Sequence, residues 1–362
     1  MPSVRIESGE GQFAELRARW QDLVSHSNTA TPFQTWEWQS LWWKHFGGIK
    51  KPIFLVIEEG KDLIALWPLM RSRAVWRKLR PMGVGPSDYL HPLIQTGAEQ
   101  RISRLIWEAL GEVKGIDLID IHQLRETNAL AQIASQDLDV QILEQSKCLV
   151  LDLPETFDAY LSMLGKSLRY DVRRLEKSLF QSGKATVETA KVDQVEDSMN
   201  IFFHQHRKRW HRRGLPGAFL GRSVAFHTEW TRVAAERGWL RLSTLRLDNQ
   251  PVGSIYAMAL GKTSYYYQAG FDSAHRAISP GTLLVAHTIQ RAINDGQTAF
   301  DFMRGDEGYK LRWKPQRTVK NLRIVIGGCS QMGRLGSRWT MKENQVEQRV
   351  RARLEGRDAL KP

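Results

Sequence analysis

Three strand-like runs joined by short turns restrict the possible folds of this chain more than any other feature. Each run is rich in apolar, aromatic and β-branched residues, and only a short turn separates it from the next. Turns of this kind join neighbouring antiparallel strands. The sequence therefore predicts an antiparallel three-stranded meander over residues 239–247, 252–260 and 263–271.

Helical patterns surround this meander. Ser279-Pro280-Gly281 opens a helix that Gly296 ends, and Thr298–Met303 is typical of a buried strand. A last strand is expected over Thr318–Ile326. Before the meander, three helices with an apolar face are expected at residues 166–182, 195–214 and 223–237. This order predicts an α/β fold with a mixed, mostly antiparallel sheet flanked by helices.

The N-terminal half repeats the same order of elements more faintly. The expected helices cover residues 11–25, 35–46 and 98–112, and the expected strands cover 53–58, 63–70, 89–94 and 116–121. A duplication explains this parallel, so we expect two tandem domains. We place an N-terminal domain at 1–147, a C-terminal domain at 148–328 and a charged tail, forming an exposed helix or a frayed end, at 329–362.

Length and composition agree with two soluble domains. The chain has 362 residues, of which 42% are apolar, and no run approaches the length of a membrane-spanning helix. Cys148 and Cys329 are its only cysteines, and both lie in apolar, strand-like surroundings that suit reduced, buried thiols. We expect a cytoplasmic protein with no disulfide framework and no bound metal.

The charge balance favours anionic partners. Lys and Arg outnumber Asp and Glu by 52 to 39. Nucleic acid, phosphorylated cofactors, acidic carriers and anionic lipid headgroups all remain open, and so does the simpler interpretation of solvated helix faces. No sequence-reading nucleic-acid motif is present. The basic clusters comprise Lys166, Arg169, Arg173, Arg174 and Lys177; Arg207, Lys208, Arg209, Arg212 and Arg213; and the arginines after Arg334.

The segment His275–Leu284 predicts an anion site. It lies between a strand and a helix, Pro280 suits the first helical turn, and Gly281 permits close approach to bare backbone amides. A phosphate at this position would meet free N–H groups and the positive end of the helix dipole. The alternative is that Ser279-Pro280-Gly281 only starts a helix.

Several motifs together resemble a known group of enzymes. Arg276 and Gly281 match the first and last positions of the pyrophosphate-binding loop of GNAT acyltransferases, and Ser279 replaces its first glycine. Further matches are Asp301–Trp313, Arg209-Trp210 followed by Gly214, and Leu247-Asp248 followed by Pro251-Val252-Gly253. With these matches, the chain resembles the CelD-like (cellulose biosynthesis protein) tandem-GNAT family, which is related to the FemAB transferases.

The resemblance implies a site for acetyl-CoA or another acyl-CoA in the C-terminal domain. The residues expected to contact this co-substrate are Arg276, Ser279, Gly281, Thr282 and Leu283 at the helix start and Tyr267 and Gln268 on the preceding strand. Strand alternation sends Tyr265 and Tyr267 to one face and Tyr266 to the other, so one face should line the cleft. Core packing is the alternative for this tyrosine row.

The segment after the buried strand carries the expected catalytic groups. In GNAT enzymes a tyrosine after the fifth strand often protonates the departing thiolate, and the resemblance implies this role for Tyr309. Asp301, Asp306 or Glu307 is expected to orient or deprotonate an amine. Lys310 matches a lysine of FemAB-like enzymes and is expected to bind donor phosphate or the carbonyl. The alternatives are packing for Tyr309 and, for Asp301, an ion pair with a cation such as Arg304 or Lys310.

These observations lead to one functional hypothesis and two rivals. The chain is expected to be an N-acyltransferase that moves an acyl group from acyl-CoA or an acyl-carrier protein to an amine. The acceptor class that we expect is an amino sugar of envelope or exopolysaccharide metabolism, with peripheral membrane contact left open. The rivals are aminoacyl transfer from charged tRNA, as in FemAB relatives, and a non-catalytic GNAT pair that serves as a binding scaffold.

Overall fold

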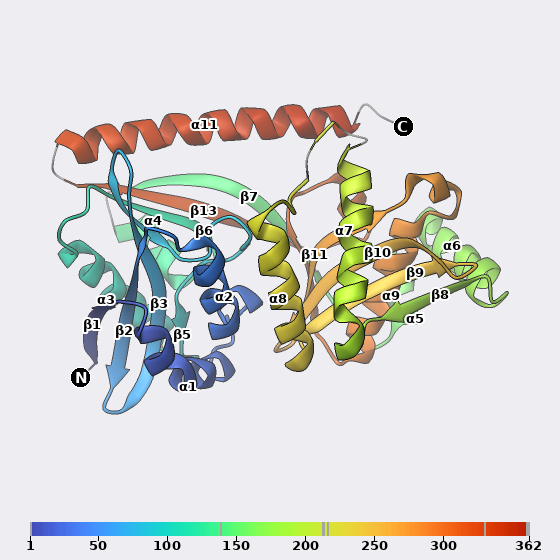
Figure 1. Ribbon diagram of the computed structural model, residues 1–362, viewed down its shortest axis with the longest axis horizontal. Helices are drawn as coiled ribbons and strands as arrows, with labels where there is room; N and C mark the ends of the chain where they lie inside the picture. The colour runs from blue at the N-terminus through green and yellow to red at the C-terminus, as the bar shows by residue number, and fades with distance from the viewer. Residues whose placement is uncertain (1, 138–139, 212–213, 216, 329–330, 360–362) are drawn as a thin grey trace. The chain divides into compact units, whose positions relative to one another are not determined.

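The computed structural model describes residues 2–359 except 138–139, 212–213, 216 and 329–330, and describes only the backbone of 137, 273 and 347–359. The chain divides into two compact units, Met1–Lys147 with Val319–Pro362 (unit 1) and Cys148–Thr318 (unit 2). Strand β7 (Gln141–Asp152) crosses the first boundary, and β13 (Arg317–Gly327) crosses the second. Figure 1 shows the elements along the chain.

Unit 1 contains a mixed sheet in the order β1-β2-β3-β4-β6-β13. Neighbouring strands are antiparallel except β4 and β6, which are parallel. The short strand β5 pairs with β3. The new strands are β1 (Ser3–Ser8), β2 (Lys51–Glu59), β3 (Asp62–Arg73), β4 (Arg77–Pro81), β5 (Leu93–Ile94) and β6 (Leu118–Arg125).

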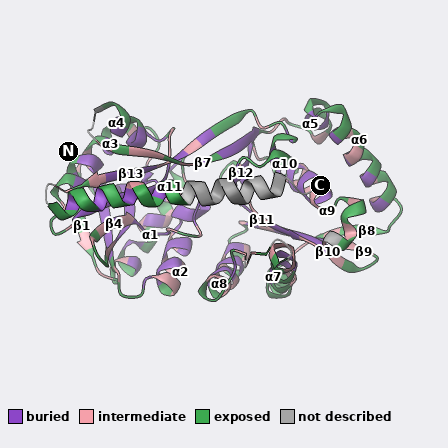
Figure 2. Ribbon diagram, turned by 90° about the horizontal axis from the view of Figure 1, so that it is seen from above, coloured by how far each residue is buried: buried purple, intermediate pink, exposed green. Residues whose placement is uncertain are grey.

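Helices cover both faces of the unit 1 sheet. In Figure 2, α1 (Gln12–Ser25) and α2 (Trp36–Phe46) lie on one face, and α3 (Glu99–Glu112) and α4 (Ala129–Asp137) on the other. Ile102 and Ile106 of α3 and Leu130 of α4 enter a buried cluster with the sheet. The helices expected near residues 11–25, 35–46 and 98–112 are therefore present. The expected strand over residues 89–94 is reduced to the two residues of β5.

Unit 2 contains the predicted meander. Strands β9 (Leu240–Leu247), β10 (Gln250–Leu260) and β11 (Thr263–Phe271) pair in antiparallel fashion, so the expectation from the short turns is confirmed. The order continues on one side to β8 (Ala185–Thr189) and on the other to β12 (Ala299–Arg304) and the second half of β7. Among the strand pairs described within unit 2, β11–β12 is the parallel one. The expected α/β class with a mixed sheet flanked by helices is confirmed.

The helices of unit 2 also form two layers. Helices α7 (Val195–His211) and α8 (Arg222–Glu236) lie on one face of the sheet, and α5 (Phe157–Met163), α6 (Lys166–Leu175) and α9 (Pro280–Asn294) on the other (Figure 2). At Gly270 of β11, an added Cβ would lie 2.6 Å from the backbone nitrogen of His206. This close approach requires glycine and fixes α7 against the end of β11.

The C-terminal segment differs from the expected domain boundaries. Residues 319–328 group with unit 1 and not with the second domain, and α11 (Gln331–Ala359) is a helix that also belongs to unit 1. Cys148 is a buried free thiol, whereas Cys329 lies outside the described residues. Across the described part of the chain, no helix combines the length and the apolar character needed to cross a membrane.

Candidate functional site

The two parallel strands of unit 2 separate shortly after they begin to pair. Their register runs from Thr263 opposite Ala299 to Tyr265 opposite Asp301, and then ends. Strand β11 continues to Phe271 and β12 to Arg304. Beyond Tyr265, this edge of β11 therefore has no strand partner from β12. Ligands of open α/β sheets bind at the carboxyl ends of strands, so this divergence is the candidate site.

A bulge in β11 lies at the same place. Against β10, Gln268 pairs with Tyr256 and Tyr266 pairs with Ala257, so Tyr267 is an extra residue in the ladder. Tyr266 packs with Phe302 in the core cluster that α9 covers. The hydroxyl of Tyr267 lies 3.4 Å from Nε2 of His227 on α8. Neighbouring tyrosines thus face opposite sides, as strand alternation predicts.

The loop that follows β12 is held by its own polar groups. Asp301 is buried, and its Oδ1 accepts a hydrogen bond of 2.8 Å from the backbone nitrogen of Met303. Met303 has a φ of 59° and Gly305 a φ of 104°. A Cβ at Gly305 would lie 2.5 Å from the carboxylate of Glu307. Glycine is needed there because the chain turns back tightly on itself.

Lys310 closes this loop from inside. It is 3% exposed, and its Nζ donates to the carbonyl oxygens of Arg304 (2.8 Å) and Gly305 (3.1 Å). The same nitrogen forms an ion pair of 2.9 Å with Glu307. An ammonium group has three N–H donors, and these three acceptors use all of them. The expected contact of Lys310 with donor phosphate or the carbonyl would require it to give up a loop contact, and Glu307 is likewise engaged.

The Lys310→Met variant should therefore lose stability. The apolar side chain fills a similar volume but leaves one buried and one partly buried carbonyl group without their donor, which destabilises by about 1–3 kcal/mol. Thermal and denaturant unfolding should show this loss. Lys314→Met, four residues further along the chain, is the control. An equal effect of the two substitutions would contradict the structural role of Lys310.

The hydroxyl of Tyr309 lies beside Tyr266 at the divergence of the strands. The two phenols are hydrogen-bonded, and burial raises the pKa of each, that of Tyr309 well above 10. Tyr266 and Glu307 raise the pKa of Tyr309 further, because neighbouring negative charge disfavours the phenolate. Tyr309 is still 39% exposed, so water limits the size of the shift. It is a protonated phenol at the boundary of protein and solvent.

Arg209 of α7 adds a positive charge to this pair. Its Nη1 donates to the Ala269 carbonyl (3.1 Å), and its guanidinium lies 4.4 Å from the ring centre of Phe271. It lowers the pKa of both Tyr266 and Tyr309, against the larger effect of burial. In the sequence, Arg209 stands in a basic cluster and in the motif Arg209-Trp210, and neither feature predicted its place in the site. Arg209 and Trp210 continue the apolar face of the helix expected over residues 195–214, and this position could have indicated that Arg209 lies against the sheet.

The start of α9 offers less bare backbone than expected. Ser279 adopts a left-handed conformation with φ 46°, and its carbonyl accepts from the amides of Thr282 (2.9 Å) and Leu283 (3.2 Å). Pro280 has no N–H, so of the amides of residues 280–283 only that of Gly281 has no hydrogen bond to Ser279. Leu283 is buried in the core, which leaves only its backbone near the site.

Phe271 connects the two groups of site residues. A Cβ on Gly281 would lie 3.5 Å from the Phe271 ring, which also carries the Arg209 guanidinium. Arg209 thus lies close to the start of α9. Arg276 is exposed in the short helix Ser273–Ile278 just before α9, Asp306 is exposed in the loop after β12, and Gln268 is partly buried on β11.

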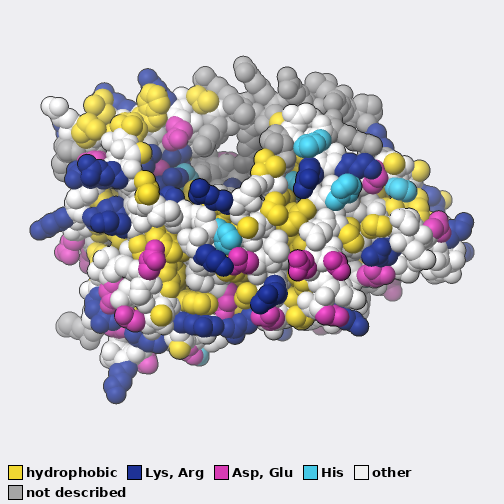
Figure 3. All heavy atoms as spheres, in the orientation of Figure 1, with side chains coloured by type: hydrophobic (Ala, Val, Ile, Leu, Met, Phe, Trp, Pro, Cys, Tyr) yellow, Lys and Arg dark blue, Asp and Glu magenta, His cyan; other side chains and the backbone are white. Residues whose placement is uncertain are grey.

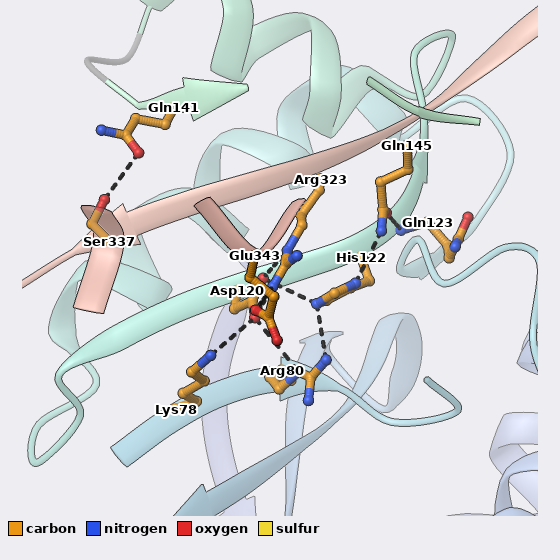
Figure 4. Close-up of polar contacts among 10 residues, drawn as sticks. All are labelled: Lys78, Arg80, Asp120, His122, Gln123, Gln141, Gln145, Arg323, Ser337 and Glu343. Atoms are coloured by element: carbon orange, nitrogen blue, oxygen red, sulfur yellow. Dashed lines mark hydrogen bonds and ion pairs between the residues drawn. The ribbon is translucent and has the colours of Figure 1, made fainter. Parts of the chain in front are cut away.

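A second polar cluster lies in unit 1 and was not expected from the sequence. Asp120 of β6 is fully buried and accepts two hydrogen bonds from Arg323 of β13, of 2.7 and 2.9 Å (Figure 4). Lys78 and Arg80 of β4 each approach the same carboxylate to 3.7 Å. Glu343 of α11 binds Arg323 at 3.2 Å. Three cations thus surround one buried carboxylate.

His122 is part of this cluster. Gln145 accepts from the backbone nitrogen of Gln123 (2.7 Å), and its amide nitrogen lies 3.1 Å from Nδ1 of His122. Nε2 of the same ring lies 3.0 Å from Oδ1 of Asp120 and 2.9 Å from Nη2 of Arg80. Burial lowers the pKa of His122 to about 4, so the ring is neutral at pH 7. This arrangement joins β4, β6, β7 and β13.

No three His, Cys, Asp or Glu side chains come together as a metal site within the described ranges. Residues 166–311 match the model of the acetyltransferase (GNAT) domain. The match begins at the first residue of α6 and ends at the last residue of α10 (Gly308–Leu311), so this domain lies in unit 2. No curated protein matches the sequence significantly.

Solved structures share the fold of both units. A crystal structure of FemX has a TM-score of 0.62 and 11% identity and covers 88% of this chain and 96% of that chain. The C-terminal domain of a putative lysylphosphatidylglycerol synthetase from Agrobacterium fabrum has a TM-score of 0.55 and 14% identity, and covers 86% of this chain and 92% of that chain. A tandem GNAT protein from the clavulanic acid biosynthesis pathway has a TM-score of 0.53 and 10% identity, and covers 91% of this chain and 100% of that chain. At such identities the likeness concerns the fold alone.

Proposed function

We propose that unit 2 transfers an acyl group from a thioester to an amine. The observation that carries this proposal is the divergence of β11 from β12 directly beside the Tyr266–Tyr309 phenol pair. The divergence leaves strand edge exposed for a thioester carbonyl, and the phenol pair places a proton donor next to it. Arg209 supplies positive charge at the same end of β11.

The reaction needs one proton to enter and one to leave. The amine nitrogen bonds to the carbonyl carbon, the carbon–sulfur bond breaks, and the thiolate takes a proton. Tyr309 is suited to donate that proton because its phenol stays protonated at neutral pH. Of the expected bases, Glu307 pairs with Lys310 and Asp301 binds the Met303 amide. Asp306 is exposed after β12, and all three carboxylates stay our candidates for receiving the proton of the amine.

The donor that we propose is acetyl-CoA or another acyl-CoA. The Gly281 amide at the positive end of the fifteen-residue α9 suits a pyrophosphate oxygen, and the exposed Arg276 lies just before it. An acyl-carrier protein would present the same thioester. Assignment to the CelD-like family, a cytoplasmic location and an amino-sugar acceptor of envelope or exopolysaccharide metabolism belong to the same proposal and rest on the motif resemblance.

Aminoacyl transfer from charged tRNA is the second candidate. Two similar folds favour it, FemX and a putative lysylphosphatidylglycerol synthetase, whose name implies transfer of a lysyl group. A tRNA donor would contact the chain mainly through phosphates, so its binding should weaken steeply with salt. A non-catalytic scaffold is the third candidate, and it predicts no turnover with any donor.

Calorimetry with CoA, acetyl-CoA and tRNA separates these candidates. We expect CoA to bind, and Gly281→Val to weaken that binding by roughly tenfold because a branched side chain shields the helix-start amide. Gly281→Ala should have a small effect, since its Cβ meets Phe271 at an ordinary contact distance of 3.5 Å. Gly111→Val, where an added Cβ meets no atom within 4 Å, is the control. Tight, selective binding of tRNA that survives moderate salt and is lost at high salt, with no CoA binding, would favour the second candidate.

A further inference from the structure

Helix α11 has the reverse of the usual distribution of side chains. Between Gln331 and Val346, the residues that it buries against unit 1 are small or polar, and four of its five large apolar residues are exposed. The buried set is Gly333, Gly336, Ser337, Thr340 and Asn344. The exposed apolar set is Met332, Leu335, Trp339 and Val346, which are between 44% and 59% exposed. A helix on a soluble protein normally buries its apolar stripe.

The buried face shows why these residues are small. A Cβ on Gly333 would lie 2.4 Å from the carbonyl oxygen of Gly328, and one on Gly336 would lie 3.0 Å from the ring of Trp76. Ser337 donates to Gln141 at 2.9 Å, and Glu343 pairs with Arg323. The small and polar face of α11 therefore packs on unit 1, and its apolar face points to solvent.

The exposed apolar residues form one stripe. Met332, Leu335 and Trp339 follow one another at spacings of three and four, and Val346 lies seven residues further along the same face. The Trp339 ring lies 6.3 Å from that of Trp76, beside which Val75, at the tip of the β3–β4 hairpin, is 70% exposed. Figure 3 shows hydrophobic side chains at the upper left, where Figure 1 draws the start of α11. We call Met332, Leu335, Trp339, Val346 and Val75 the outer apolar stripe.

Basic residues border this stripe. Arg338 and Lys342 are exposed and lie next to Trp339 on the helix, while the acidic Glu343 is turned to Arg323. The sequence between Gln331 and Val346 contains three basic residues, Arg334, Arg338 and Lys342, and one acidic residue. A second copy of the chain would bring the same cations face to face, so self-association through this stripe is disfavoured electrostatically.

We propose that the outer apolar stripe binds the surface of an anionic lipid membrane. Trp, Leu and Met side chains insert at the boundary between headgroups and acyl chains, and Arg and Lys beside them contact anionic headgroups. The helix lies in the plane of the membrane surface. The inference depends on α11 and the β3–β4 hairpin alone, so it stands or falls independently of the acyl-transfer site.

Vesicle co-sedimentation of the full chain tests this proposal. We expect binding to vesicles of phosphatidylcholine with phosphatidylglycerol and little binding to phosphatidylcholine alone. The double variant Leu335→Asp/Trp339→Asp should bind at least roughly tenfold more weakly, because it removes the inserting side chains and adds like charge to the lipid. Arg338→Glu/Lys342→Glu should also weaken binding and reduce its salt dependence.

A matched control separates the stripe from general surface charge. Ile49→Asp/Tyr170→Asp changes two exposed apolar residues outside α11, which are 95% and 64% exposed, and should bind as the unsubstituted chain does. Unchanged melting temperatures of all variants would show that they fold. The proposal is overturned if the unsubstituted chain does not bind anionic vesicles at low salt. It is equally overturned if Leu335→Asp/Trp339→Asp binds normally, or abolishes a dimer seen by sedimentation.

Discussion

Replacement of Tyr309 by Phe is expected to lower turnover by roughly 10²–10⁴-fold while donor affinity stays nearly unchanged. The Phe ring can occupy the same place beside Tyr266, and only the proton donor is lost. A donor that acts in the transition state affects turnover more than ground-state binding. Steady-state kinetics with the accepted amine, together with calorimetry of the donor, would measure both quantities.

Two further variants sharpen this test. Tyr266→Phe removes the hydrogen-bond partner and should reduce turnover less than Tyr309→Phe, because the Tyr309 hydroxyl remains. Tyr170→Phe removes a phenol that is 64% exposed on α6 and should leave turnover intact. Full activity of Tyr309→Phe would show that another group donates the proton to the thiolate.

Replacement of Arg323 by Met is expected to destabilise unit 1 by about 3–5 kcal/mol, because it leaves the Asp120 carboxylate buried without its bidentate partner. Lys78 and Arg80 lie 3.7 Å from that carboxylate, too far to replace two hydrogen bonds of 2.7 and 2.9 Å. Glu343 of α11 would also lose its partner. Denaturant unfolding near pH 7 would measure the loss.

The beginning of the same strand provides the control. Arg317 pairs with Asp152 at 2.6 Å, but both side chains are about half exposed. Arg317→Met should therefore change stability by less than about 1 kcal/mol. If the two substitutions had the same small effect, the Asp120 cluster would not stabilise unit 1 in the way that its burial indicates.

The Asp301–Lys310 segment illustrates the limit of motif reasoning. The sequence placed five candidate catalytic residues in it, because acidic, basic and phenolic groups follow a buried strand closely. The structure uses Asp301, Glu307 and Lys310 within the loop itself, through contacts to backbone groups and to each other. Spacing along the chain cannot reveal this, because the lysine side chain turns back to the carbonyl of a residue six positions earlier.

Local patterns determined most of the secondary structure. Residues 240–271 form a meander because alternating apolar runs and short turns leave no other pairing, and α9 begins at Pro280 because proline is preorganised for a first turn. Strand β4 was not predicted, because its five residues, Arg77–Pro81, are mostly basic and too few to show a strand pattern. Its lysine and arginine side chains approach Asp120, and that partner lies about forty residues away.

The tertiary structure decided which polar groups are committed and which remain available. Arg209 belongs to the site because Gly270 allows α7 to approach the end of β11, and α11 turns its apolar residues outward because its small residues meet the backbone of unit 1. Hydrophobic periodicity is a property of neighbouring residues and can be read along the chain. Satisfaction of a buried donor or acceptor depends on atoms distant in sequence, so only the folded chain determines it.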